Sequence, residues 1–273
     1  KTLFDGAGVA YPTEEWNWDD FLVAAKKLTK QDPKTRQHVW GFHVAHNYMW
    51  YWVWQNGGEV MDADFRGTKS LLGQPAALEA LQFARDLIWE HKVAPKPADV
   101  EGKGLFDTFI LGNIAMAETH SWQLTDIVAR APFDWDVTYL PKGRTGQRGS
   151  VIFADGYGIY RGTKHPEAAL RFLKFITSPY AEEVMTTSIL GLQPSRRSVA
   201  PIWDTQSAMA TVGKNASIYT KTAEFARLDP YFINDAKVRE IRVPIMEQIY
   251  LLNKISVEEG IRQYEEKLPR VYE

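Results

Sequence analysis

Hydrophobic and polar positions alternate along this chain with two different periods. Apolar residues spaced three or four positions apart predict amphipathic helices at 13–28, 75–91, 164–177, 180–188, 237–252 and 257–268. Short apolar or alternating runs predict strands at 39–44, 60–65, 114–116, 135–140 and 151–160, the last interrupted by a turn. Helices interleaved with short buried strands indicate an α/β fold.

A very aromatic helix is predicted over 49–55, ended by the glycines that follow Asn56. Trp50, Trp52 and Trp54 stand at alternate positions, so they cannot all lie on one face of a helix. We therefore expect at least one of these indoles to face a cleft or a partner.

The stretch 104–123 holds the strongest candidate for a site. A predicted helix from Leu105 ends at Gly112, a short buried strand follows, and the polar run 118–121 leads into Trp122. In open α/β sheets, ligands bind beyond the carboxyl ends of the strands. On this pattern alone, Trp122 is equally compatible with a ligand contact and with a core position.

Composition narrows the function classes. The chain has 273 residues, enough for one large or two ordinary domains, with 32 basic and 34 acidic residues. It has no long basic run, so nothing indicates nucleic-acid binding. The absence of cysteine excludes disulfides, cysteine-ligated metals and a thiol nucleophile. No apolar run is long enough to cross a bilayer, and the first residues lack the layout of a signal peptide, so the chain is either cytosolic or a downstream part of its gene product.

Six ordered motifs carry a resemblance to a known family. They are KTLFDGAG at 1–8, YPTEEWNWDDF at 11–21, QNGGEVMD at 55–62, FILGNIAMAETHSW at 109–122, DGYGIYRGTKHPEAALRFLKFITSP at 155–179 and GLQPSRRSV at 191–199. With them the chain resembles the C-terminal two-thirds or so of family 1 extracellular solute-binding proteins, the sugar-binding components of bacterial ABC importers.

The resemblance implies a periplasmic-binding-protein-like (type II) fold of two α/β lobes that close on a ligand. It assigns 1–147 and 216–273 to the C-terminal lobe and 148–215 to a returning part of the N-terminal lobe. It also implies that the sheet of the N-terminal lobe lies upstream of Lys1. We therefore expect 148–215 to present an exposed apolar face and to associate with a partner or rearrange.

The resemblance also implies a ligand-binding role for individual positions. Trp122 matches an aromatic residue that stacks on sugar, although the family's glycine is replaced here by His120-Ser121. Asp155 replaces the first glycine of a crossover motif and would place a carboxylate at the floor of the cleft. The full set of expected contacts is Asn47, Trp50, Glu118, His120, Trp122, Asp155, Gly156, Tyr157, Arg196, Tyr231 and Arg239.

The implied function is binding of a sugar or oligosaccharide and its delivery to an ABC permease, without a cofactor or a metal. Indole and phenol rings stack on pyranose C–H faces, and carboxylate, amide and guanidinium groups bind hydroxyls. Ligand binding would shift an equilibrium from open to closed lobes. The location would be periplasmic or at the cell surface, with or without a lipid anchor.

Three alternatives stay open. Glu118 and Asp155 are suitable residue types for a glycosidase pair, although spacing in sequence says nothing about their separation. His43, His46, Glu118 and His120 are suitable metal ligands, but on a strand His43 and His46 would point to opposite faces. The same fold could instead bind a peptide, a polyamine, glycerol-phosphate or another small solute.

Overall fold

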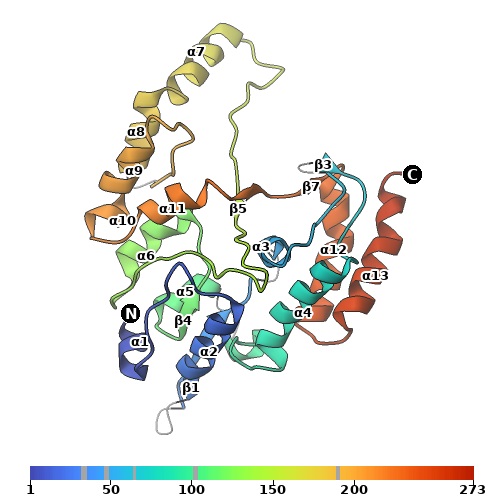
Figure 1. Ribbon diagram of the computed structural model, residues 1–273. Coiled ribbons are helices and arrows are strands. Elements are labelled where there is room, and N and C mark those ends of the chain that lie inside the picture. Colours follow the sequence, from blue (N-terminus) through green and yellow to red (C-terminus); the bar gives the residue numbers. More distant parts are fainter. Residues whose placement is uncertain (32–35, 46–48, 64–65, 101–103, 189–190) are drawn as a thin grey trace. The chain divides into compact units, whose positions relative to one another are not determined.

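The computed structural model describes residues 1–31, 36–45, 49–63, 66–100, 104–188 and 191–273. Contacts between residues divide the chain into two compact units (Figure 1). Unit 1 contains residues 1–118, 139–152 and 225–273, and unit 2 contains residues 119–138 and 153–224. This division differs from the expected lobes chiefly at 119–138 and 216–224, which group with unit 2.

Unit 1 combines helices with short strands. Its helices are α1 (Thr2–Ala7), α2 (Trp18–Leu28), α3 (Trp50–Gln55), α4 (Pro75–Trp89), α5 (Leu105–Ile110), α12 (Asp235–Tyr250) and α13 (Val257–Lys267), with the 3-10 turns η1 (Pro97–Val100) and η3 (Leu268–Val271). Its strands are β1 (Lys30–Gln31), β2 (His38–His43), β3 (Arg66–Gly67), β4 (Ile114–Ala117), β5 (Val151–Ile152), β6 (Arg227–Leu228) and β7 (Tyr231–Phe232).

The described strands form three small sheets, of which the largest has the order β1-β2-β4. Strands β2 and β4 are parallel, with Trp40 opposite Ile114. Helix α2 packs on β2, and Gly41 permits the close approach because a Cβ at this position would lie 2.1 Å from the carbonyl oxygen of Ala25. The predicted strands at 39–44 and 114–116 are thereby confirmed. Of the predicted strand at 60–65, the described residues 60–63 contain only an isolated bridge, between Met61 and Ser70.

Two glycines end helices of unit 1 as the sequence predicts. Gly57 follows α3 with φ 77°, and Gly112 follows α5 with φ 78°, both in the left-handed region that glycine adopts without strain. Helix α2 starts later than predicted, at Trp18, because the Asn17 side chain accepts hydrogen bonds from the backbone N–H groups of Asp19 and Asp20.

The core of unit 1 is aromatic and surrounds α3. The Trp52 indole is fully buried, with the rings of Trp18, Phe21, Phe42 and Phe83 at centroid distances of 5.6, 5.9, 6.2 and 5.5 Å. Every residue of α3 is buried. The expectation that one of its alternating indoles would face a cleft is therefore wrong, because this helix is covered on all sides.

Unit 2 is largely helical. Its helices are α6 (Leu124–Arg130), α7 (Pro166–Ile176), α8 (Pro179–Thr187), α9 (Ala200–Gln206), α10 (Ala208–Thr211) and α11 (Ser217–Thr222), and the 3-10 turn η2 (Ser121–Gln123) precedes α6. Helix α6 packs on α10, and Lys214 forms an ion pair of 2.6 Å with Asp134. These contacts explain why 119–138 groups with unit 2.

Two strands predicted from alternation do not form. Residues 135–140 and 153–160 have no strand assignment, and only Val151–Ile152 of the second run pairs, with β6. Alternation marks a two-sided segment, but a strand also requires a neighbouring strand to accept and donate its backbone hydrogen bonds. No described residue supplies that partner for 153–160.

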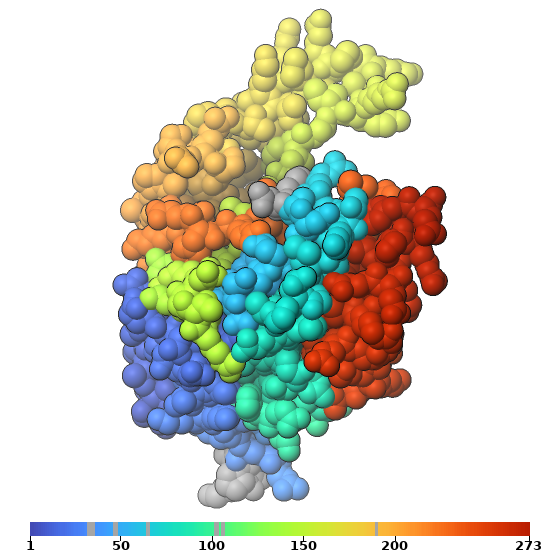
Figure 2. All heavy atoms as spheres, turned by 45° about the vertical axis from the view of Figure 1, so that its right-hand side comes forward, coloured from blue at the N-terminus to red at the C-terminus, as the bar shows by residue number. Residues whose placement is uncertain are grey.

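Helix α7 and the segment before it carry exposed apolar side chains, as expected for 148–215. No residue of α7 is buried; the helix belongs to the yellow atoms of Figure 2. The side chain of Phe172 is 64% exposed. Tyr160 and Phe175 are also exposed. Neighbouring exposed apolar side chains of this kind mark a surface that packs against something else.

Candidate functional site

The turn η2 presents Trp122 at the surface of unit 2. The indole is 46% exposed, and one side of it is stacked on the imidazole of His120, with centroids 4.3 Å apart and planes inclined by 2°. The ring of Phe153 meets both edge-on, at 5.2 Å from His120 and 5.5 Å from Trp122. The three rings form a cluster, called here the Trp122 stack, that leaves part of the indole accessible.

The backbone of His120 is fixed by Gln123. The N–H of His120 donates to Gln123 Oε1 at 2.9 Å, and the carbonyl of His120 accepts from the N–H of Gln123 at 3.0 Å. Burial lowers the pKa of His120 to about 4, so its imidazole is neutral at pH 7. The ring stacked on the indole is therefore uncharged at pH 7.

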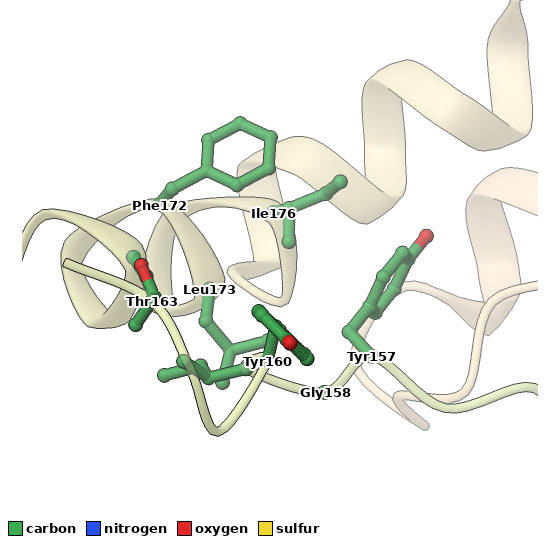
Figure 3. A pocket seen from close by; sticks show the side chains of 9 residues that line it. Tyr157, Gly158, Tyr160, Thr163, Phe172, Leu173 and Ile176 are labelled. Carbon is green, nitrogen blue, oxygen red and sulfur yellow. The ribbon is translucent and has the colours of Figure 1, made fainter. Parts of the chain in front are cut away.

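Residues 155–157 lie in an exposed, irregular segment of unit 2. Asp155 and Gly156 are exposed, and the hydroxyl of Tyr157 donates to Met185 Sδ at 3.7 Å. Figure 3 shows the Tyr157 ring at one side of a hollow that 157–160, Thr163 and α7 line. The side chains in this hollow are apolar or aromatic apart from the Thr163 hydroxyl, which suits packing better than sugar recognition.

Arg196 is engaged by its own unit. Its guanidinium donates to the carbonyl of Thr177 just after α7, at 3.1 Å from Nε and 2.6 Å from Nη2. It also lies 3.5 Å from the carboxylate of Glu182, which accepts from Ser195 Oγ at 2.7 Å. The structure thus uses Arg196 to join α7, α8 and the turn at 195–196.

Glu118, the last residue of unit 1 before the chain enters unit 2, is buried. Its carboxyl group accepts a hydrogen bond from the hydroxyl of Tyr51. Burial raises the pKa of Glu118 to about 8, so this carboxyl group is protonated at neutral pH. A neutral buried acid at this point holds β4 to α3 and presents no charge at the surface.

Trp50 is also buried, at 4% exposure, and the guanidinium of Arg242 lies 4.9 Å above its ring. This cation–π contact occupies a face of the indole. Asn47, the neighbouring candidate, lies outside the described residues, as does His46 of the metal alternative.

A second candidate surface lies entirely in unit 1, at the corner between β6 and β7. Tyr231 is 39% exposed, and the guanidinium of Arg239 lies 6.0 Å from its ring centroid. Arg239 forms ion pairs with Asp235 at 2.5 Å and Asp229 at 4.0 Å. The resemblance implies ligand contacts at Tyr231 and Arg239 of this corner, but it gives no sign of Asp229 beside them.

Neither a metal centre nor a membrane-spanning helix is found among the described residues. They contain no group of three His, Asp or Glu side chains placed to hold an ion. Within the same ranges, no helix is both long and apolar enough to cross a membrane.

Two solved structures resemble the chain closely in fold. An ABC substrate-binding protein from Listeria monocytogenes in complex with cycloalternan is 27% identical, with a TM-score of 0.83 over 99% of this chain and 67% of that chain. Maltose-bound MalE3 of T. maritima is 22% identical, with a TM-score of 0.76 over 99% of this chain and 68% of that chain. The α/β fold of two-lobe periplasmic binding proteins is thereby confirmed.

Sequence relatives are binding proteins as well. A putative binding protein of Brucella abortus (strain 2308) is 25% identical over 92% of this chain and 59% of its own length. An arabinooligosaccharide-binding protein of Halalkalibacterium halodurans is 27% identical over 75% of this chain and 45% of its own length. The chain therefore spans about half the length of these curated relatives.

The family model described as bacterial extracellular solute-binding protein matches residues 1–183, which is well over half of the chain. Together with the ordered motifs and the fold, this match shows that the chain belongs to the family of bacterial extracellular solute-binding proteins.

Proposed function

We propose that the protein is the solute-binding component of a bacterial ABC importer and that its solute is a sugar or an oligosaccharide. The observation that carries the proposal is the Trp122 stack: an indole 46% exposed, supported by a second ring and free of charged neighbours in the stack. Pyranose rings present apolar C–H faces that pack on such a surface. Relatives named for oligosaccharide ligands support the same class of solute.

Polar contacts would come from exposed groups in each unit. In unit 2, Asp155, Gly156 and Tyr157 lie at the surface near Phe153 in sequence. In unit 1, Arg239 presents a guanidinium beside the Tyr231 ring, a pairing of donor and aromatic surface that suits a hydroxylated ligand. We propose each of these two surfaces as a candidate ligand-contacting surface of its own unit.

The proposal extends to the full-length protein. We propose that a part of the gene product upstream of Lys1 packs on the apolar face of α7, because this face is exposed and the chain spans 59% of its Brucella relative. The complete protein would then work outside the cytoplasm, free or lipid-anchored, and deliver its solute to a membrane permease. Closure upon ligand binding would be the signal that the permease reads.

The test is a calorimetric titration of the full-length gene product with a panel of mono- and oligosaccharides, repeated on Trp122→Ala. We expect one sugar to bind saturably and its affinity to fall at least about tenfold in Trp122→Ala, because aromatic rings dominate such contacts. Tyr180→Ala, an exposed aromatic of α8, is the matched control and should leave affinity unchanged.

Two outcomes would contradict the proposal. The protein could bind no sugar and instead bind a peptide, a polyamine or another non-sugar solute saturably. That result would show that its solute is not a sugar. Hydrolysis of a bound sugar, lost in Glu118→Gln, would replace a pure binding protein with an enzyme.

A further inference from the structure

We propose that His120 is a positioning residue that holds the indole of Trp122 in the orientation in which it meets the ligand. The inference rests on the proposed ligand-binding role of Trp122. It changes the role expected for His120 from a ligand contact to a support. It also gives a reason for the side chain that stands where the resembling family has a glycine, since glycine has no ring to stack.

The rings of His120 and Trp122 are closely stacked. The imidazole and the indole are parallel within 2° at a centroid distance of 4.3 Å, which is close stacking rather than incidental proximity. The imidazole thus covers one face of the indole, and the partly exposed remainder is where a sugar ring could pack. A ligand pressing on the open side would meet an indole that is backed by a second ring.

The backbone that carries the imidazole is anchored by hydrogen bonds within unit 2. Gln123 Oε1 accepts the backbone N–H of His120 at 2.9 Å and the hydroxyl of Thr119 at 3.4 Å. The hydroxyl of Tyr219 on α11 donates to the carbonyl of Thr119 at 3.5 Å. Residues 119–123 are therefore tied to one another and to a helix of their own unit.

The Phe153 ring contacts both stacked rings edge-on. It lies at 78° to the imidazole and 77° to the indole, an edge-to-face arrangement with both. Moving the indole off the imidazole would break two favourable ring contacts. An exposed tryptophan in a short turn would otherwise sample several rotamers, and each binding event would have to select one of them.

Holding the Trp122 indole in one orientation before the ligand binds should increase the affinity for the ligand. An aromatic pair contributes about 0.5–1.5 kcal/mol beyond area burial, which corresponds to roughly two- to tenfold in a binding constant. Loss of the imidazole should therefore weaken ligand binding by roughly two- to tenfold without removing the indole that touches the ligand.

The experiment uses full-length protein labelled with 5-fluorotryptophan, with the Trp122 ¹⁹F resonance assigned by its absence in Trp122→Phe. His120→Ala removes the stacking ring, and His120→Phe retains a ring. His165→Ala, at an exposed histidine just before α7, is the matched control. The ¹⁹F line width and solvent isotope shift report the order and exposure of the indole without any ligand, and titration with maltotriose reports affinity.

In His120→Ala we expect a changed, more solvent-exposed Trp122 resonance and an affinity lowered by roughly two- to tenfold. His120→Phe should restore both, and His165→Ala should change neither. An unaltered Trp122 resonance in His120→Ala would overturn the proposal. Equal losses of affinity in the Ala and Phe variants would also overturn it, since the imidazole nitrogens would then contact the ligand.

This design separates the inference from the proposed function. If maltotriose and the rest of the panel fail to bind the unmodified protein, the sugar-binding proposal fails. The ¹⁹F resonance still decides whether His120 orders Trp122. Circular dichroism of each variant confirms that the helices remain folded.

Discussion

Helices α3 and α7 hold their aromatic side chains in opposite environments. The six residues of α3 are all buried although its indoles point in several directions, whereas the strongly amphipathic α7 buries none of its residues. Helix α3 is surrounded by aromatic residues of its own unit, and Arg227 and Arg242 lie over the rings of Trp54 and Trp50. The apolar face of a helix is stabilised when another part of the protein covers it. The sequence of the helix does not show whether the surrounding chain provides that cover.

The comparison predicts very unequal effects of similar truncations. Trp52→Ala should lower the free energy of unfolding by about 3–5 kcal/mol, because it opens a cavity among rings that cannot collapse. Phe172→Ala, at a side chain 64% exposed, should change it by no more than about 0.5 kcal/mol in this chain. Urea unfolding followed by circular dichroism measures both. Similar values for the two variants would remove the distinction between the helices.

Burial in unit 1 also raises the pKa of Glu118. The folded protein keeps a proton on Glu118 up to a pH of about 8, whereas the unfolded chain releases it near the ordinary pKa of 4.5. Folding stability contributed by this group is therefore full below pH 4.5 and declines as the pH rises towards 8. Glu118→Gln cannot ionise, so we expect it to gain roughly 2–4 kcal/mol over the unmodified protein by pH 8 and little at pH 4.

Thermal unfolding of the Glu118→Gln variant between pH 4 and pH 9 measures this difference. The amide can still accept from the hydroxyl of Tyr51, so the substitution removes the titration and keeps the hydrogen bond. A stability difference that does not depend on pH would show that Glu118 is ionised in the folded protein.

Substitution of Gly41 should also show how closely unit 1 is packed. Gly41→Ala places a Cβ 2.1 Å from the backbone carbonyl oxygen of Ala25, so α2 must move away from β2. We expect a loss of about 1–3 kcal/mol in the free energy of unfolding. Gly158→Ala in unit 2 meets nothing within 4 Å and is the control, with an expected change below about 0.5 kcal/mol.

The smallest effect on stability, but a clear one on surface chemistry, is expected on α7. Phe175→Ser should leave the unfolding temperature of this chain nearly unchanged and reduce its binding of the apolar dye ANS, because the Phe175 side chain is exposed. In the full-length protein the same substitution should lower the unfolding temperature, since the proposed upstream part would cover this face. An unchanged full-length protein would argue against that cover.

The candidate site was predictable where a local signal existed. Gly112, the short strand after it and the polar run towards Trp122 marked the turn at 118–122, and the structure exposes Trp122 there. The resemblance also implies ligand contacts at Trp50 and Glu118, yet both side chains are buried. The type of a residue and its position in a motif do not show which other side chains will cover it in the folded protein.

Asp229 shows the converse limit. Its carboxylate lies 4.0 Å from Arg239 and is buried, and burial raises its pKa, against the opposing effect of Arg242 and Arg239. The residues next to Asp229 in the sequence give no sign of an ionic cluster. The two arginines that approach this corner come from α12, after β7, and no local pattern links them to it.

The sequence by itself determined most of the long helices, the strands near 39–44 and 114–116, and the glycines at which α3 and α5 end, because periodicity and left-handed turns act over a few residues. It also determined the family, through six motifs in a fixed order. The tertiary structure alone decided which apolar faces are covered, why 135–140 and 153–160 form no strands, and how His120 backs Trp122. Burial, strand pairing and ring stacking depend on side chains brought together in space, and their free energies exist only once the chain has folded.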